Sequence, residues 1–267
     1  DKPEFDEEFE DVFKHESPDR KKEIQKRYGT MRAYLENMDR LRKIAGNLVN
    51  HYIDEVLPNG YKAMVVASSV LAAARYEFLI LEAIKLRLEE EKNKAERDEE
   101  LIEQLEFIDA STVVTMQDNN EEAVISAVRK KAKERKAVDN FKKDFDLEKD
   151  DDGQYKHPNT GIAFLCVCDR LLTGFDAPIA QVMYLDKSLR EHDLLQAIAR
   201  VNRTKGTKQH GILVDYFGVS NHLHDALAIW GSETEEDIKD LLAHFRDIDD
   251  EIPVLQARYK RLVQHFE

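Results

Sequence analysis

Three polar residues in the C-terminal half of the chain have the types and the spacing that phosphate chemistry requires. Gln196, Arg200 and Arg203 follow one another at intervals of four and three residues in the segment LLQAIARVNR. At the helical period, these intervals place side chains on one face of a helix. A guanidinium is always charged and presents a planar fork of donors, so it suits phosphoryl oxygens. The spacing therefore predicts a helix that directs a glutamine and two arginines away from the core.

The opposite face of this predicted helix is apolar. Leu194, Ile198 and Val201 share one stripe, which is expected to hold the helix against a sheet. An alternative interpretation of the polar stripe is a solvated helix face, which is the commoner explanation for an isolated Gln/Arg stripe. The segments that precede the helix favour the phosphate interpretation, because they occur in the order that a nucleotide-binding α/β fold requires.

Two continuous apolar runs, 162–168 and 182–186, precede the helix and are separated by the polar turn TGFDAP at 173–178. Such runs are typical of strands that are buried on both faces of a parallel sheet. Further strand candidates occupy 62–68, 111–116 and 211–217. The sequence thus predicts an α/β fold with a parallel sheet flanked by helices. Ligands of such sheets gather at the carboxyl ends of the strands.

The segments LLTGFDAP and LLQAIARVNR resemble motifs V and VI of superfamily 2 helicases. They closely resemble those of the motor (R) subunit of type I restriction enzymes. The pattern Gln-x-x-x-Arg-x-x-Arg matches Gln196, Arg200 and Arg203, and Ala199 stands where many relatives carry glycine. The resemblance covers roughly residues 5–230 and implies a RecA-like parallel sheet, the second lobe of a DNA translocase.

This resemblance also implies roles for the matching residues. Arg200 and Arg203 would be arginine fingers that act on the γ-phosphate of ATP. Gln196 would contact the nucleotide, and Gly174 and Asp176 would lie on the nucleotide side of the cleft. The implied cofactors are ATP and Mg²⁺, bound mainly by a first lobe that this sequence does not contain.

DNA contacts are expected at the start of a helix that follows the first strand. Ser68 and Ser69 lie at that helix N-terminus, whose free N–H groups and positive dipole suit a phosphate. An ordinary turn with a capping serine is the alternative. By resemblance, Thr173 would face a DNA phosphate as well. The basic segment 129–143 is a further candidate surface for phosphates, although a solvated helix face is the commoner explanation.

The amino-acid composition limits which partners and which cellular location fit this sequence. The net charge is −14, from 40 basic and 54 acidic residues, so only a local basic surface is expected to bind DNA. Cys166 and Cys168 lie inside an apolar run and are predicted to be buried thiols. No metal site is predicted, and Asp215 is interpreted as structural. No apolar run approaches the roughly 20 residues that span a bilayer, so no membrane partner and a cytoplasmic location are expected.

The domain organisation expected from these patterns has three parts. Residues 1–60 are predicted to be a helical N-terminal linker region, 61–231 the RecA-like helicase lobe with motifs IV to VI, and 232–267 the start of a C-terminal helical region. The sequence contains no phosphate loop, no Asp-Glu-x-His motif and no nuclease centre. With Asp1 as its first residue, the chain is expected to be an inactive fragment of a longer protein.

The leading functional hypothesis is that this lobe supplies arginine fingers and DNA-backbone contacts for ATP-driven translocation along double-stranded DNA, which precedes cleavage. The resemblance implies an ATP-dependent type I site-specific deoxyribonuclease, with methylation and specificity subunits as partners. The alternative hypothesis is a non-catalytic interaction module that docks other subunits of a nucleic-acid-processing complex. The ordered motif pair favours the first hypothesis.

Overall fold

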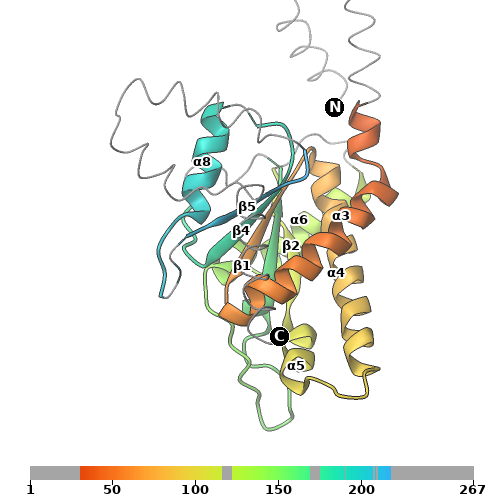
Figure 1. Ribbon diagram of the computed structural model, residues 1–267, viewed down its shortest axis with the longest axis vertical. Coiled ribbons are helices and arrows are strands. Elements are labelled where there is room, and N and C mark those ends of the chain that lie inside the picture. The colour runs from red at the N-terminus through yellow and green to blue at the C-terminus, as the bar shows by residue number, and fades with distance from the viewer. Residues whose placement is uncertain are drawn as a thin grey trace, which may run out of the picture. The chain divides into compact units, whose positions relative to one another are not determined.

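A five-stranded parallel sheet forms the centre of the fold, in the order β2-β3-β1-β4-β5 (Figure 1). Every residue of β1, β3 and β4 is buried, which explains why continuous apolar runs encode them. The fold confirms the prediction of an α/β protein with a parallel sheet flanked by helices. In chain order the strands are β1 (Lys62–Ala67), β2 (Asp109–Thr112), β3 (Ile162–Val167), β4 (Ala180–Asp186) and β5 (Ile212–Asp215).

A computed structural model of the chain provides these coordinates, and the residues that it describes are 31–115, 122–168, 175–189, 191–206, 208 and 210–217. The chain divides into two compact units, 1–219 and 220–267, and all described residues lie in the first. The helical predictions for residues 1–30 and 232–267 therefore lie outside the described residues. Among the residues that are described, no helix is both long and apolar enough to cross a membrane.

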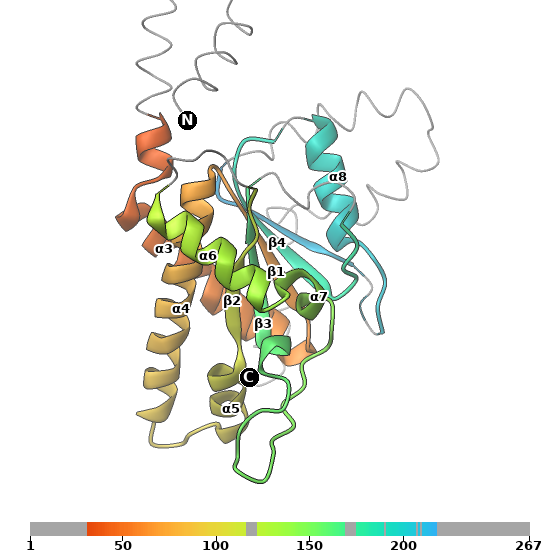
Figure 2. The ribbon, with the colours of Figure 1, turned by 180° about the vertical axis from the view of Figure 1, so that it is seen from behind.

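Helices cover both faces of the sheet. Figure 1 shows α3 in front of the strands and α4 beside them, and the reverse view in Figure 2 brings α6 and α7 to the front. Helix α8 packs against β4. The α-helices are α3 (Met38–His51), α4 (Val70–Lys92), α5 (Glu99–Phe107), α6 (Ala123–Glu134), α7 (Ala137–Phe141) and α8 (Glu191–Val201). Shorter turns are η1 (Tyr52–Val56), η2 (Leu57–Asn59) and η3 (Pro158–Gly161).

Helix α3 lies within the region 1–60 that the sequence predicts to be helical, and one of its faces is apolar. Asn37 caps α3 by accepting hydrogen bonds from the backbone N–H groups of Asp39 and Arg40. The helical run continues through η1 and η2 and ends at Gly60, whose φ of 74° lies in the left-handed region that glycine favours. The apolar face is buried against the rest of the unit at Leu41, Ala45, Leu48, Val49, Tyr52, Ile53 and Val56.

Strand β2 differs from its prediction. The sequence predicts a strand over 111–116, whereas β2 starts two residues earlier and ends at Thr112. Its limits follow from its partner, because Asp109 pairs opposite Ile162 at the start of β3. Beyond Thr112, one further bond continues the ladder, from the Val113 N–H to the carbonyl of Cys166 at 2.9 Å. Local β propensity identifies the segment, but the neighbouring strand determines where pairing begins and ends.

A lysine is buried at the amino end of β1. The side chain of Lys62 is 0% exposed, and its Nζ donates to the carbonyls of Thr160 at 2.7 Å and Asn140 at 3.3 Å. The ammonium also lies 4.7 Å from the centre of the Phe145 ring. Burial lowers the pKa of Lys62 to about 7, because the charged form loses its hydration.

Replacing Lys62 by methionine is expected to change how stability depends on pH. The folded-state pKa of about 7 lies below the ordinary 10.5, so the unfolded chain binds more protons between these values. This group therefore makes the free energy of unfolding rise with pH across that window, by up to about 1.4 kcal/mol per pH unit. Lys62→Met should lack this contribution. Urea unfolding of both proteins across the window tests it, and parallel pH profiles would contradict a buried, titrating Lys62.

Candidate functional site at the carboxyl edge of the sheet

The neighbouring strands β1 and β4 are followed by connections that run to opposite edges of the sheet. From β1 the chain runs through α4 toward β2 at one edge of the sheet, whereas from β4 it runs through α8 to β5 at the other. In open parallel sheets, ligands bind in the crevice at such a switch point. The candidate site is therefore built from the segments that follow β1, β3 and β4.

Helix α8 carries the polar stripe predicted from the sequence. Leu194, Ile198 and Val201 are buried, so the predicted apolar stripe is confirmed. On the other side, Gln196 and Arg200 are partly exposed.

The helix ends earlier than the sequence predicts. Because α8 ends at Val201, Arg203 lies in the segment after the helix and not on it. The backbone of Gly211 approaches this helix end so closely that an added Cβ would lie 2.6 Å from the Val201 carbonyl oxygen. In addition, the Gly211 N–H donates to the side-chain oxygen of Asn202 at 3.2 Å. The returning chain leading to β5 thus occupies the space that the next helical turn would need.

Two of the residues singled out in the sequence form an ion pair. Nη1 of Arg203 lies 2.8 Å from Oδ1 of Asp176, and the two side chains are 41% and 55% exposed. An exposed pair of this kind contributes only about 0–1 kcal/mol to stability. The guanidinium can therefore exchange this carboxylate for another anion at little cost to the fold. Gly174 and Thr173 lie outside the described residues.

The two serines after β1 differ in what their hydroxyls do. Ser69 is the N-cap of α4, since its Oγ accepts from the Ala72 N–H at 3.0 Å and donates to Oε1 of Glu36 at 2.6 Å. This is the capping role that was the alternative to a phosphate contact. Oγ of Ser68 is buried and has no hydrogen-bond partner in the described part of the chain. Of the two hydroxyls, that of Ser68 is the one left for a ligand.

A buried ion pair at this edge escaped the sequence analysis. Asp186, at the end of β4, is 1% exposed and receives two bonds from the guanidinium of Arg40, at 2.8 and 2.5 Å. The hydroxyl of Tyr76 donates to the same carboxylate at 2.6 Å. These contacts tie α3 and α4 to β4. An acid at the end of a fully buried strand is a signal that a partner exists, but its arginine lies 146 residues away in the sequence.

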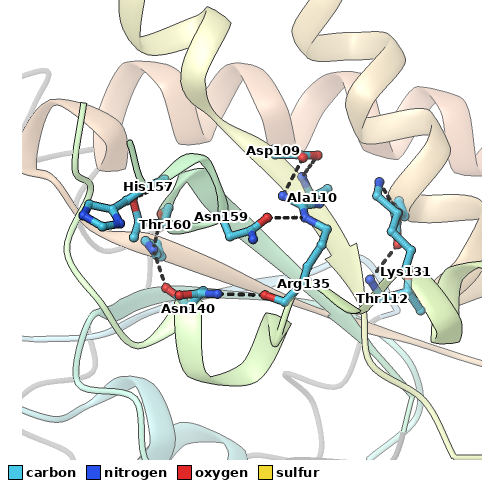
Figure 3. Close-up of polar contacts among 11 residues, drawn as sticks. Asp109, Ala110, Thr112, Lys131, Arg135, Asn140, His157, Asn159 and Thr160 are labelled. Carbon is cyan, nitrogen blue, oxygen red and sulfur yellow. Dashed lines mark hydrogen bonds and ion pairs between the residues drawn. The ribbon is translucent and has the colours of Figure 1, made fainter. Parts of the chain in front are cut away.

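The basic segment 129–143 is partly engaged in internal contacts. Lys131 lies 2.9 Å from the buried carboxylate of Glu77. Figure 3 shows Arg135 between Asp109 and Asn159, with which it makes contacts of 2.7 and 2.9 Å. These two cations hold α6 to the neighbouring elements, so the structure favours a packing role for them over a phosphate surface.

Other hollows and clusters do not coincide with the predicted site. A groove of about 650 Å³, lined by residues 140, 143–147 and 156–160, lies before β3 and thus away from the carboxyl edge. Of the residues predicted to contact phosphates, only the end of the basic segment 129–143 reaches it, at Asn140 and Lys143. Within the described ranges, no group of three or more His, Cys, Asp or Glu side chains could hold a metal ion. Cys166 and Cys168 are buried thiols that form no disulfide, as predicted.

Known proteins similar to this chain are subunits of restriction enzymes. The putative type I restriction enzyme MjaVIIP endonuclease subunit of Methanocaldococcus jannaschii is 32% identical over 83% of this chain and 19% of its own length. The putative MjaIXP endonuclease subunit of the same organism is 26% identical over 99% of the chain and 21% of its own length. The HindI endonuclease subunit of Haemophilus influenzae is 43% identical over 30% of the chain and 8% of its own length.

The chain spans about a fifth of the length of the first two of these relatives. A family model described as type I restriction enzyme subunit R domain 3 matches residues 59–217, which include the whole sheet and the carboxyl-edge site. Because this match covers more than half of the chain, the chain belongs to the family of type I restriction enzyme subunit R domain 3.

Proposed function

We propose that this chain is the second RecA-like lobe of a type I restriction enzyme R subunit. In this role it supplies arginine fingers and DNA-backbone contacts for ATP-driven translocation along double-stranded DNA, which precedes cleavage. The observation that carries the proposal is the Arg203–Asp176 pair, in which an exposed guanidinium at the site already holds an anionic oxygen at 2.8 Å. The family match to domain 3 of the type I restriction enzyme R subunit supports this proposal.

The residues of this edge fit the terminal phosphates of ATP. Bound ATP with Mg²⁺ supplies the phosphoryl group and the free energy of its hydrolysis. Arg203 offers a planar fork to anionic oxygens, and Arg200 on α8 would add a second positive charge. Gln196, one turn earlier, would orient the nucleotide. We assign the metal ligands to the first lobe that the sequence resemblance implies.

Asp176 has a positioning role in this proposal. It holds Arg203 in place when no phosphate is bound, and it releases the guanidinium when a phosphoryl oxygen competes for it. If the Arg203 side chain is already held in place, it loses less conformational freedom when the two lobes close on ATP. Closure then needs less rearrangement of this lobe.

The proposed DNA contacts lie at the same edge. The N-terminus of α4, which follows Ser68 and the capping Ser69, would bind backbone phosphates together with Thr173, without reading sequence. Because the Ser69 hydroxyl is engaged in the cap, Ser68 would supply the hydroxyl of this contact. The methylation and specificity subunits of a type I complex would supply recognition of the DNA target. These partners belong to the whole R subunit, of which this chain would be one lobe.

Comparing the 267-residue chain with a full-length R subunit that contains it tests the two-lobe proposal. The chain alone is expected to hydrolyse no ATP above background and to bind nucleotide weakly, because half of the cleft is absent. The full-length subunit should hydrolyse ATP when DNA is present. Arg203→Gln in each protein is the matched control. Steady turnover by the pure chain that disappears in Arg203→Gln would overturn the proposal, because the chain would then hold a complete active site.

A further inference from the structure

A carboxylate of the chain itself lies at the N-terminus of α4. Oε1 of Glu36 accepts a hydrogen bond from the Ser69 hydroxyl at 2.6 Å. Helix α4 is 23 residues long, and its first N–H groups and the positive end of its dipole attract an anion at this position. Glu36 comes from the segment before α3, 33 residues earlier in the chain than Ser69. An anionic group from elsewhere in the fold thus occupies the start of α4.

Further contacts hold the segment 31–37 against this end of α4. The guanidinium of Arg75, on α4, donates a hydrogen bond to the backbone carbonyl of Glu36. Nη1 of Arg40, on α3, donates to the carbonyl of Leu35 at 3.5 Å. The side chain of Glu36 is only 14% exposed. The backbone on both sides of the carboxylate is therefore fixed, and the segment lies over the start of α4 as a strap.

The groups that bind the Glu36 carboxylate can bind another anion in its place. Nε of Arg32 lies 3.1 Å from Oε1 of Glu36, and because the Arg32 side chain is 48% exposed, water and salt screen this pair. Oγ of Ser69 also accepts from the Ala72 N–H at 3.0 Å. When the carboxylate leaves, this hydroxyl still caps the helix, and its proton becomes available. A phosphate oxygen that replaces Glu36 therefore meets a hydroxyl donor and a guanidinium.

We propose that Glu36 makes an autoinhibitory contact, in which its carboxylate occupies the N-terminus of α4 until a backbone phosphate of double-stranded DNA replaces it. The inference rests on the proposed function and adds regulation to its DNA-contacting edge. Asp176 stands in the same relation to Arg203, because there too a carboxylate of the chain binds a donor assigned to phosphate. The free lobe binds DNA weakly for this reason, since a phosphate must displace the carboxylate and overcome its repulsion.

Binding of the 267-residue chain to duplex DNA of about 20 base pairs tests this proposal, with two unrelated sequences and a series of salt concentrations. Glu36→Gln removes the negative charge and keeps the size of the side chain, and Glu36→Ala also empties the helix end. One additional phosphate contact steepens the log–log salt slope by about 0.9, which corresponds to about eightfold tighter binding at about 0.1 M salt. Both variants should show this gain equally for the two sequences.

Asp39→Asn provides the matched control. Asp39 lies three residues after Glu36, but its side chain is 87% exposed and pairs with Arg42 at 3.4 Å instead of the start of α4. Its replacement removes the same unit of negative charge from the same part of the chain. Because solvent screens this exposed charge, DNA affinity should change by less than about twofold. A melting curve for each variant confirms that the lobe remains folded.

The outcomes separate this inference from the proposed function. If wild type binds DNA and neither Glu36 variant binds it more tightly, the carboxylate only packs the segment 31–37, and the proposed DNA edge stands. An equal gain in Asp39→Asn would reveal a general effect of net charge and also overturn the inference. DNA binding by the Glu36 variants alone would support it. Absence of binding by wild type and by both Glu36 variants would overturn both the autoinhibitory contact and the DNA edge of the proposed function.

Discussion

Replacing Arg203 by lysine is expected to remove most of the DNA-stimulated ATP turnover of the full-length R subunit while the lobe stays folded. Lysine keeps the positive charge but loses the planar fork that bridges phosphoryl oxygens. Arginine fingers are worth about 10³–10⁵ in rate, so the loss should be at least about a thousandfold. Stability should change little, because the Arg203 side chain is 41% exposed and its pair with Asp176 is a surface ion pair.

The matched variants of this experiment lie on α8. Arg200→Lys should lose turnover in the same way, whereas Ile198→Asp should unfold the lobe because it places an unpaired charge at a position that is 3% exposed. Turnover on DNA and a melting curve are measured for each variant. Near-normal turnover in both arginine variants would show that the polar stripe is only a solvated helix face.

Loss of the Arg40–Asp186 pair is expected to give the largest change in stability of any single ion pair described above. Arg40→Ala leaves the carboxylate of Asp186 buried, and among the residues that the structure describes the Tyr76 hydroxyl is then its remaining side-chain hydrogen-bond partner. Removing one member of a buried pair costs about 3–5 kcal/mol, because the other charge is left without compensation. Urea unfolding should show this loss as a lower midpoint with an unchanged slope.

Two controls show whether the loss of stability in Arg40→Ala comes from breaking a buried ion pair or from removing any arginine. Arg42→Ala breaks the exposed pair with Asp39, at 3.4 Å and with side chains 49% and 87% exposed, and should cost at most about 1 kcal/mol. Tyr76→Phe removes one hydrogen bond to a charged group and should cost about 1.5–3 kcal/mol. If Arg40→Ala were as stable as Arg42→Ala, α3 would not be held to the sheet through Asp186.

Local patterns in the sequence determined most of the elements of this fold. Continuous apolar runs predicted β1, β3 and β4, because a strand covered on both faces is built mainly of apolar side chains. A similar run predicted β5, which is only partly buried. The apolar and polar stripes of α8 predicted which of its side chains are buried, because the helical period determines the direction of a side chain from its spacing in the sequence. Motif order and spacing indicated the restriction-enzyme family that the similarity to known subunits then confirmed.

Contacts between distant segments could not be obtained from those patterns. The ion pairs of Arg203 with Asp176 and of Arg40 with Asp186 depend on how the strands and helices are arranged in space, which no local pattern specifies. The early end of α8 depends on the close approach of Gly211.

The sequence by itself determined which apolar segments are buried, which face of α8 is polar and to which family the chain is related. Only the tertiary structure decided which charges meet. Burial of apolar side chains depends on the type and spacing of residues along a short segment, so the sequence shows it. An ion pair, in contrast, depends on the position of a partner that the chain can bring from any distance. Arg40 shows this most clearly, since nothing in its own helix distinguishes it from Arg42, yet only Arg40 lies opposite the end of β4 and binds the buried carboxylate of Asp186.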